Sequence, residues 1–268
     1  MLRSKLSVVC ALLLASAAGF ITGCSVTPVD KTAGMSPNTL YSEAKEEMGL
    51  GQWEKAVPLL EKLEARAAGT PLAQQAQLDK AYAHFKSAEP AQAIATLERF
   101  MRLHPASPAL DYALYLKGII NFNDDLGMFS AVTLQDMSER DQKAAKESFE
   151  SFKELVARFP DSRYAPDARE RMNYIVGALA MYEVHVARYY YRRGAYLAAI
   201  NRAQLAVADY RDVPAIEEAL FLIYKSYDAL GMKQLRDDAK RVLEKNYPQS
   251  DYLLKGGKPN TDPWWKLW

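Results

Sequence analysis

The sequence predicts an all-α protein in which about five helix-turn-helix units stack into a superhelical array. Residues with high helix propensity (Ala, Leu, Glu, Lys, Gln and Arg) dominate, and the alternating β-branched pattern of strands is absent. A small residue, then an aromatic residue or proline, then alanine recurs along the chain. Prolines also recur where one helix must end before the next begins. These observations indicate repeated helical pairs.

Residues 1–23 have the order of an export signal. Arg3 and Lys5 precede an apolar run over residues 6–20, which is short for a membrane span of about 20 residues. The small residue Gly23 then stands directly before Cys24. We expect the signal to be removed. A cut elsewhere nearby, which would leave Cys24 as an ordinary thiol, stays open as the alternative.

The four residues Ile-Thr-Gly-Cys at 21–24 resemble the bacterial lipobox. The resemblance implies cleavage before Cys24, an S-diacylglycerol on its thiol and an N-palmitoyl group on its new amine. Two or more acyl chains give stable membrane anchoring. Ser25, where an Asp favours inner-membrane retention, implies the outer membrane. Residues 24–36 are expected to be the lipidated N-terminus and a flexible tether.

The first helix is expected to begin at Ser36 and Pro37, which suit the N-cap and the first helical position. The recurring pattern opens later helices at residues 51–56, 88–93 and 194–199. Four and seven residues beyond each alanine, further residues fall on the same helix face: Leu60 and Leu63, Leu97 and Phe100, Ala203 and Ala206. We expect the alanines where two helices cross closely.

Helix ends also repeat. Pro105, Pro160 and Pro248 are each followed two residues later by a serine that can cap the next helix. Pro71 and Pro105 lie 34 residues apart, and the sequence resembles the 34-residue tetratricopeptide repeat. The five units span about 37–70, 74–107, 111–162, 167–213 and 216–250. Such repeats stack into a superhelix with a concave groove that binds peptides.

The third unit is interrupted. An acidic, aromatic stretch follows Asn121 and predicts an insertion between its two helices over residues 124–140. We therefore expect N-terminal repeats with a peptide groove over 37–123 and C-terminal repeats over 141–254. A long helix is expected to run from Pro166 to about residue 193.

Residues 255–268 form a Trp-rich tail. Two glycines and two prolines argue against a continuing helix, and three of the four tryptophans fall in the last five residues. These tryptophans are expected to bury against this body, a partner or the membrane headgroup region. The sequence leaves these alternatives open.

The composition argues against several kinds of chemistry. Cys10 leaves with the signal and Cys24 is expected to be acylated, so no disulfide or thiolate site remains. The three histidines lie in different repeats without metal-ligand spacing, and no catalytic motif is present. Removing Arg3 and Lys5 takes Lys+Arg from 34 to 32 against 33 acids, a balance that gives no reason to expect nucleic acid. We expect no enzyme activity, no metal and no cofactor beyond the covalent lipid.

In tetratricopeptide domains the first helix of each repeat faces the ligand. Carried onto this chain, the resemblance implies peptide contacts from three successive units: Tyr41 and Lys45; Leu78, Tyr82 and Phe85; Tyr112, Tyr115 and Ile119. This half suits an extended peptide with aromatic residues and a free carboxylate. The C-terminal half, with Arg188 and Tyr191, is more charged and suits a folded partner. Any of these tyrosines could instead pack between helices.

Several segments together resemble the BamD, or ComL, family: residues 102–105 (Arg-Leu-His-Pro), 110–112 (Leu-Asp-Tyr), 115–118 (Tyr-Leu-Lys-Gly), 138–141 (Ser-Glu-Arg-Asp), 182–190 and 193–195 (Arg-Gly-Ala). The resemblance implies a non-enzymatic lipoprotein of the β-barrel assembly machinery on the periplasmic face of the outer membrane. Its N-terminal repeats would bind C-terminal signals of unfolded barrel proteins. Its C-terminal repeats would dock BamA, with Arg202 at a family position linked to that contact, and accessory lipoproteins are further expected partners.

Two other classes of function are alternatives for this sequence. One is an outer-membrane lipoprotein that links to peptidoglycan or supports DNA uptake, as the older family name suggests. The other is an enzyme whose helical array carries a catalytic domain, but the repeats already occupy the length such a domain would need.

Overall fold

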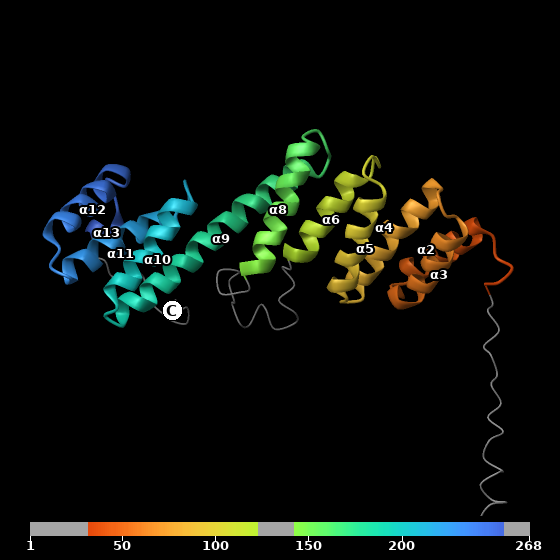
Figure 1. Cartoon of the computed structure of the whole chain (residues 1–268), viewed down its shortest axis with the longest axis horizontal. Coiled ribbons are helices and arrows are strands. Elements are labelled where there is room, and N and C mark those ends of the chain that lie inside the picture. Colours follow the sequence, from red (N-terminus) through yellow and green to blue (C-terminus); the bar gives the residue numbers. More distant parts are fainter. Residues whose placement is uncertain (1–31, 123–141, 255–268) are drawn as a thin grey trace, which may run out of the picture.

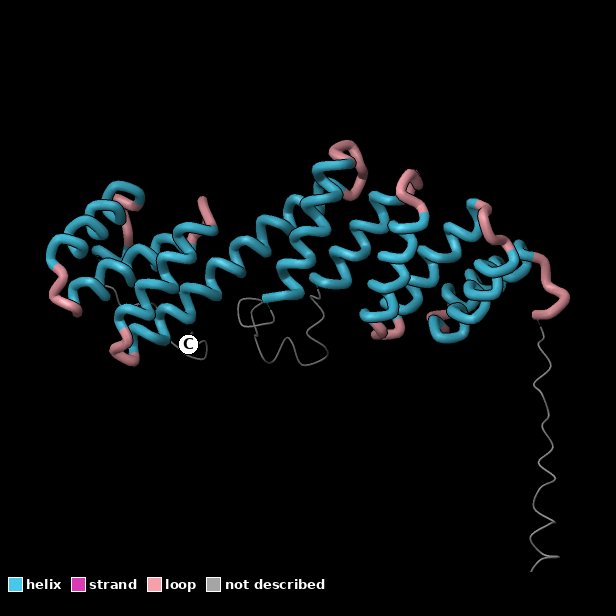
Figure 2. Tube along the Cα trace, in the orientation of Figure 1, coloured by secondary structure: helices cyan, strands magenta, loops and turns pink. Residues whose placement is uncertain are grey.

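The computed structural model describes residues 32–122 and 142–254. The expected signal, Cys24 with most of its tether, the insertion at 124–140 and the Trp-rich tail lie outside the described residues. Within the described ranges the chain is an elongated all-α array, with α2 at one end and α12 at the other (Figure 1). The described residues form helices and connecting loops and no strand (Figure 2). The predicted fold class is confirmed.

The helices of the described ranges form five antiparallel pairs followed by one short helix. In chain order they are α2 (Pro37–Gly49) and α3 (Trp53–Arg66), α4 (Pro71–Lys86) and α5 (Pro90–Leu103), α6 (Leu110–Phe122) and α8 (Gln142–Arg158), α9 (Ala165–Arg192) and α10 (Tyr196–Asp209), α11 (Ala215–Ala229) and α12 (Lys233–Asn246), then α13 (Asp251–Leu254). The second helix of each pair packs against the first helix of the next, as in a tetratricopeptide array.

The predicted start of the first helix is confirmed. The Ser36 hydroxyl accepts a hydrogen bond from the backbone N–H of Thr39 at 3.1 Å, and Pro37 occupies the first turn. Thr70 caps α4 in the same way, since its hydroxyl accepts from the N–H of Ala73 at 3.2 Å. Each cap pairs an amide that the helix itself leaves without a partner.

The small residue in the recurring pattern is explained by the backbone conformation at its position. Gly51, Ala88, Gly194 and Gly231 each have a positive φ, from 59° to 75°, at the turn inside a helical pair. The next residue's N–H donates back to a carbonyl five residues earlier, as from Gln52 to Glu47 at 2.8 Å. This is the Schellman ending of a helix, in which the left-handed residue is usually glycine. Three of these turns use glycine and one uses alanine.

The predicted crossing alanines are confirmed. Ala56, Ala93 and Ala199 are 0% exposed, and each lies on the second helix of its pair. The apolar residues predicted on the same faces, such as Leu60 and Phe100, are also fully buried. A larger side chain at these alanines would separate the helices, because protein interiors are closely packed.

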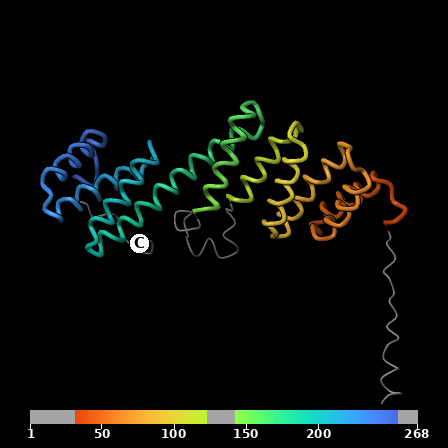
Figure 3. Tube along the Cα trace, viewed as in Figure 1, coloured from red at the N-terminus to blue at the C-terminus, as the bar shows by residue number. Residues whose placement is uncertain are grey.

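The helix α9 joins the two halves of the array. Its 28 residues span roughly 42 Å. Ala165 to Leu179 pack into the core shared with α6 and α8, whereas Ala180 to Ala187 pack into the core shared with α10 and α11. The colour gradient in Figure 3 runs steadily from one end of the array to the other, so each pair neighbours pairs adjacent in sequence. One helix therefore carries the connection between the N-terminal and C-terminal pairs.

Candidate binding surfaces

The first helices of the three N-terminal pairs bring polar and aromatic side chains together around Asp79 of α4. The Nζ of Lys45 on α2 lies 3.5 Å from Oδ2 of Asp79, and Tyr41 on α2 also interacts with this carboxylate. Tyr112 on α6 interacts with both Asp79 and Tyr82. We call this set the first-helix face: Tyr41, Lys45, Asp79, Tyr82, Tyr112 and Tyr115.

Aromatic contacts extend the first-helix face towards α9. The rings of Tyr115 and Tyr164 stack with centroids 4.6 Å apart, and Tyr112 lies 5.7 Å from the same ring. The Tyr115 hydroxyl donates to Oδ2 of Asp167 at 2.8 Å, and Arg171 donates to the same oxygen at 2.7 Å. The face is thus continuous from α2 to the start of α9.

Burial and a nearby carboxylate raise the pKa of two phenols of this face, Tyr41 and Tyr112. Burial, followed by the charge and hydrogen bond of Asp79, raises the pKa of Tyr41 to about 12. Burial and the charge of Asp79 likewise raise the pKa of Tyr112. Burial alone would raise the pKa of Asp167, but the hydrogen bonds from Arg171 and Tyr115 outweigh it and lower that pKa. The hydroxyls of Tyr41 and Tyr112 therefore stay protonated to a higher pH than an ordinary tyrosine.

Of the three predicted apolar contact residues, Leu78 differs from the tyrosines in its burial. Leu78 is 2% exposed and packs in the core with α5 and α6, which corrects the expectation that it faces a ligand. The reason is that α4 is enclosed by its neighbours on most sides. Phe85 and Ile119 are half-buried and pack against the cores beside α5 and α8. They share this half-buried state with the tyrosines of the first-helix face.

Lys45 is not a free cation, because Asp79 already opposes its charge. The sequence suggested this lysine for a ligand's free carboxylate. A second carboxylate at this position would lie close to Asp79, and like charges repel. The first-helix face is therefore aromatic with balanced charges.

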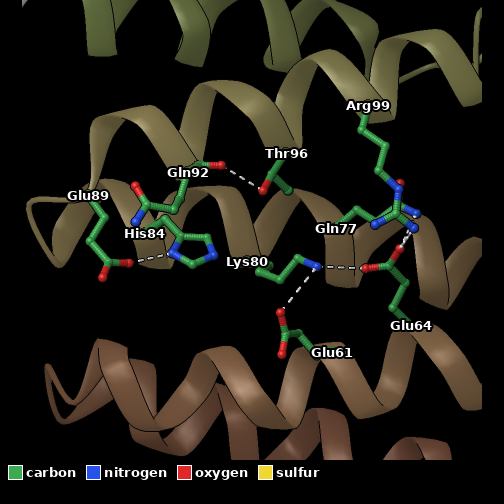
Figure 4. A network of polar contacts seen from close by, with 9 residues as sticks. All are labelled: Glu61, Glu64, Gln77, Lys80, His84, Glu89, Gln92, Thr96 and Arg99. Atoms are coloured by element: carbon green, nitrogen blue, oxygen red, sulfur yellow. Dashed lines mark hydrogen bonds and ion pairs between the residues drawn. The ribbon is translucent and has the colours of Figure 1, made fainter.

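The opposite side of α4 holds a polar network that sequence reasoning missed. Glu64 of α3 accepts hydrogen bonds from Gln77 and Lys80 of α4, both at 2.9 Å, and from Arg99 of α5 at 2.6 Å. Figure 4 shows Lys80 between Glu64 and Glu61, with Arg99 reaching Glu64 from the next helix. A hollow of about 550 Å³ lies beside this network.

Several donors hold Glu64 in its ionised form. Burial alone would raise the pKa of Glu64, but the hydrogen bond and charge of Lys80 and the contacts with Gln77 and Arg99 outweigh it, so the pKa is lowered. Farther along the same helices, Nδ1 of His84 lies 2.6 Å from Oε2 of Glu89 (Figure 4). Each of these contacts joins different helical elements, so this side of α4 is a structural clamp.

The sequence contains one signal that could have revealed the clamp. Gln77, Asp79 and Lys80 stand in a helix whose alanines, such as Ala76 and Ala81, fall on several faces and are 0% exposed. Such a helix has little surface left for solvated polar residues, so its polar residues need partners inside the protein.

In the C-terminal half, Arg188 forms an internal ion pair. Its guanidinium donates through Nε and Nη2 to the two carboxylate oxygens of Glu218 on α11, at 2.6 and 2.7 Å. The hydroxyl of Tyr252 on α13 donates to the same carboxylate at 3.0 Å. Arg188 therefore fastens α9, α11 and α13 together. This corrects the expectation that its guanidinium is offered to a partner.

Arg202 and Tyr191 lie closer to the surface. Arg202 on α10 donates to Glu183 of α9 at 3.1 Å while its side chain stays 40% exposed. On the same helix Leu197 and Leu205 are exposed. Tyr191 is half-buried, with its ring 5.5 Å from that of Tyr196. The helix α10 thus presents an arginine with the exposed Leu205 one turn away, and arginine is enriched in protein interfaces.

Neither a metal cluster nor a membrane span is found in the part of the chain that the structure describes. Its Cys, His, Asp and Glu residues form no group of three or more that could hold a metal ion. Likewise, the helices of the described ranges include none whose length and apolar content would allow it to cross a membrane.

The family model and three relatives that match this chain carry the names of outer-membrane proteins. A family model described as YfiO, outer membrane lipoprotein, matches residues 33–243. Two relatives from Neisseria are named outer membrane protein assembly factor BamD. The protein of Neisseria meningitidis is 46% identical over 244 residues, which cover 90% of this chain and 91% of the relative. The protein of Neisseria gonorrhoeae is 45% identical and covers 88% of this chain and 89% of its own length. The protein of the same name from Vibrio cholerae is 35% identical and covers 86% of this chain and 95% of its own length.

Proposed function

Because this chain belongs to the YfiO family of outer membrane lipoproteins, we propose that it is a non-enzymatic scaffold of the β-barrel assembly machinery. In this role it binds the C-terminal signals of unfolded barrel proteins and couples them to BamA for folding and insertion. Its relatives are named outer membrane protein assembly factors, which supports the assignment to outer-membrane assembly.

The observation that carries the substrate part of the proposal is the first-helix face. Tyr41, Tyr82, Tyr112 and Tyr115 come from three successive first helices and lie half-buried, so each ring keeps some accessible surface. Rings with one apolar face and a hydroxyl suit contact with an aromatic polypeptide, because they give large contact area at low entropy cost. Signals that end in an aromatic residue fit this face better than signals recognised by charge alone.

The partner part of the proposal rests on α10. Arg202, with Leu197 and Leu205 exposed on the same helix, offers a charged and apolar surface for docking BamA. Tyr191, on the adjacent helix α9, is a neighbouring contact. Accessory lipoproteins of the complex would use other parts of the array. If Arg202 is a hot spot of this interface, its truncation costs about 2 kcal/mol of binding free energy or more.

The anchoring part of the proposal concerns Cys24. An S-diacylglycerol and an N-palmitoyl group on this residue would hold the array at the periplasmic face of the outer membrane. The first helical pair follows Cys24 in the chain, so the first-helix face would lie near the membrane where barrels insert.

Photo-crosslinking to peptides that end a barrel protein's last strand tests the substrate assignment. A photoreactive phenylalanine replaces Tyr41 or Tyr82 in the full-length protein in detergent. We expect strong adducts from both positions, because both side chains are accessible on the first-helix face. Matched controls carry the same group at Glu54 and Lys55, which are exposed on α3, and should give background labelling. Equal labelling from the control positions would overturn the assignment.

A further inference from the structure

Asp79 is a buried carboxylate with unused hydrogen-bonding capacity. The residue is 8% exposed, and its Oδ1 accepts a hydrogen bond from Gln75 one turn earlier at 3.0 Å. Its Oδ2 has no hydrogen-bond partner among the described residues. A carboxylate can accept several hydrogen bonds, and a buried one that lacks them is unfavourable. Tyr41 also forms a hydrogen bond with the Asp79 side chain, so the remaining capacity lies at the buried Oδ2, which can accept a further donor.

Lys45 only partly compensates the charge of the Asp79 carboxylate. Its Nζ lies 3.5 Å from Oδ2 of Asp79, longer than a usual charge-assisted hydrogen bond. The lysine side chain is 47% exposed, whereas that of Asp79 is 11% exposed. The exposed lysine can return to water when another cation takes its place, because the buried carboxylate needs a counter-charge but the lysine does not. The buried carboxylate is thus fixed while its present counter-charge is free to move.

The surroundings of Asp79 are aromatic. Tyr41 from α2 and Tyr112 from α6 both interact with its charge, and Tyr82 lies one turn beyond it on α4. The edge of Trp53 packs on Tyr82, with ring centroids 5.7 Å apart, which fixes the orientation of that ring. Aromatic faces attract cations, most strongly where water is partly excluded. A carboxylate with tyrosines around it is the composition that binds a lysine or arginine side chain.

We propose that Asp79, with Tyr41, Tyr82 and Tyr112 around it, is a subsite for a basic side chain of the bound polypeptide, and that Lys45 occupies this subsite until the ligand's cation displaces it. The proposal rests on the proposed function of the first-helix face and specifies what that face selects. It predicts that the first-helix face prefers polypeptides in which a Lys or Arg lies within an aromatic segment.

The competing reading, in which Lys45 binds a carboxylate of the ligand, makes the opposite prediction for one variant. If the lysine is an internal competitor, its removal strengthens the binding of a basic peptide. If the lysine is the anion receptor, its removal weakens the binding of a peptide with a free C-terminal carboxylate. The sign of the Lys45→Met effect therefore separates the two readings.

The experiment is fluorescence anisotropy with the full-length protein in detergent. Short aromatic peptides carry Arg, Gln or Glu at one varied position, each with a free or an amidated C-terminus. We expect the wild type to bind the best Arg peptide about 5-fold more tightly than its Gln counterpart. Lys45→Met should widen this ratio to about 20-fold, because the internal competitor is gone. Asp79→Asn should reduce the ratio to about 1.

Lys55→Met is the matched control, since Lys55 is exposed on α3 and outside the first-helix face. Circular dichroism of each variant checks that the helical array is intact. Weaker binding of Arg peptides by Lys45→Met, or an unchanged preference in Asp79→Asn, would overturn the subsite. Equal binding of the Arg and Gln peptides would overturn it while leaving the proposed function standing. Failure of every peptide to bind would overturn the proposed function and the subsite together.

Discussion

Glu64 links three helices through one carboxylate. It lies on α3 and accepts hydrogen bonds from α4 and α5. Lys80, one of the donors, is 7% exposed, so its charge depends on this carboxylate for compensation. Removing one member of a buried pair leaves the other charge uncompensated, which is more damaging than removing both.

We expect Glu64→Gln to lower the free energy of unfolding by about 2–4 kcal/mol at neutral pH, because Lys80 then stays buried without its main counter-charge. Denaturant unfolding followed by circular dichroism measures the change. Glu61→Gln is the matched control, since Glu61 is exposed and lies 3.9 Å from the same ammonium. The control should lose less than about 1 kcal/mol. Equal losses in both variants would contradict the account of the clamp.

The stability difference between the wild type and Glu64→Gln should depend on pH, and the sign of this dependence can be predicted. The pKa of Glu64 is lowered in the folded protein, so its ionised form stabilises the fold above the unfolded value of about 4.3. This contribution is lost as the pH falls through the lowered folded pKa. The stability difference between wild type and Glu64→Gln should therefore be constant near neutral pH and shrink below about pH 4. A difference that grows on acidification would contradict the assignment.

Ala88 occupies a backbone position that the other turns give to glycine. Its φ is +59°, a conformation that strains a residue with a Cβ. We expect Ala88→Gly to raise the free energy of unfolding by about 0.5–1 kcal/mol and Gly194→Ala to lower it by about 1 kcal/mol. Thermal unfolding of both variants tests this. Changes of the same sign in both would show that backbone strain is not the cause.

Ion pairs between individual residues of different helices could not be predicted from the sequence. Arg188 and Glu218 are 30 residues apart, and Glu64 and Arg99 are 35 apart. Such pairs depend on how helices from different repeats face each other, which a repeat pattern does not specify. The same holds for Leu78: its position in the repeat suggested a ligand contact, but the packing around α4 buries it.

At the scale of the element, the contact between α6 and α8 depends on one glycine. A Cβ added at Gly118 would lie 2.4 Å from Cε1 of Phe152, whose side chain is fully buried. The hydroxyl of Ser148 also donates to the Gly118 carbonyl at 2.8 Å. The two helices therefore approach more closely than any larger residue would allow.

We expect Gly118→Ala to lower the free energy of unfolding by about 1–3 kcal/mol, because the added methyl group overpacks the core. Denaturant unfolding provides the measurement. Gly177→Ala is the matched control: Gly177 lies inside α9, and an added Cβ would meet nothing within 4 Å. This control should gain about 0.5–1 kcal/mol from better helix propensity. A neutral Gly118→Ala would show that the helices can separate without cost.

Helix positions were well predicted from sequence, because their signals are local. The proline of α2 and its serine cap, the small residue of each turn and the crossing alanines act within a few residues of the chain. The tyrosines on the first helices were chosen from repeat position, and their contact with a ligand stays a prediction. Asp79 was missed because its role arises only when α2, α4 and α6 come together. The helices could therefore be predicted from local signals, whereas the polar contacts between repeats could not.

At the scale of the whole molecule, two candidate surfaces lie in different halves of one elongated array. The first-helix face belongs to α2, α4 and α6, whereas Arg202 and its apolar neighbours belong to α10 (Figure 1). The helix α9 contributes to the core of both halves. Substrate peptide and partner are therefore expected to bind at the same time, and α9 holds the two surfaces in a fixed relation.

Simultaneous binding of peptide and partner tests this account most directly. The full-length protein in detergent is mixed with the periplasmic domains of BamA and a labelled barrel C-terminal peptide, and the complexes are followed by analytical ultracentrifugation. We expect a ternary complex that contains all three components. Arg202→Glu should release BamA but keep the peptide, and Arg211→Glu, a change at an exposed arginine beyond α10, should keep both. Displacement of the peptide by BamA, or full BamA binding by Arg202→Glu, would contradict a scaffold with two separate surfaces.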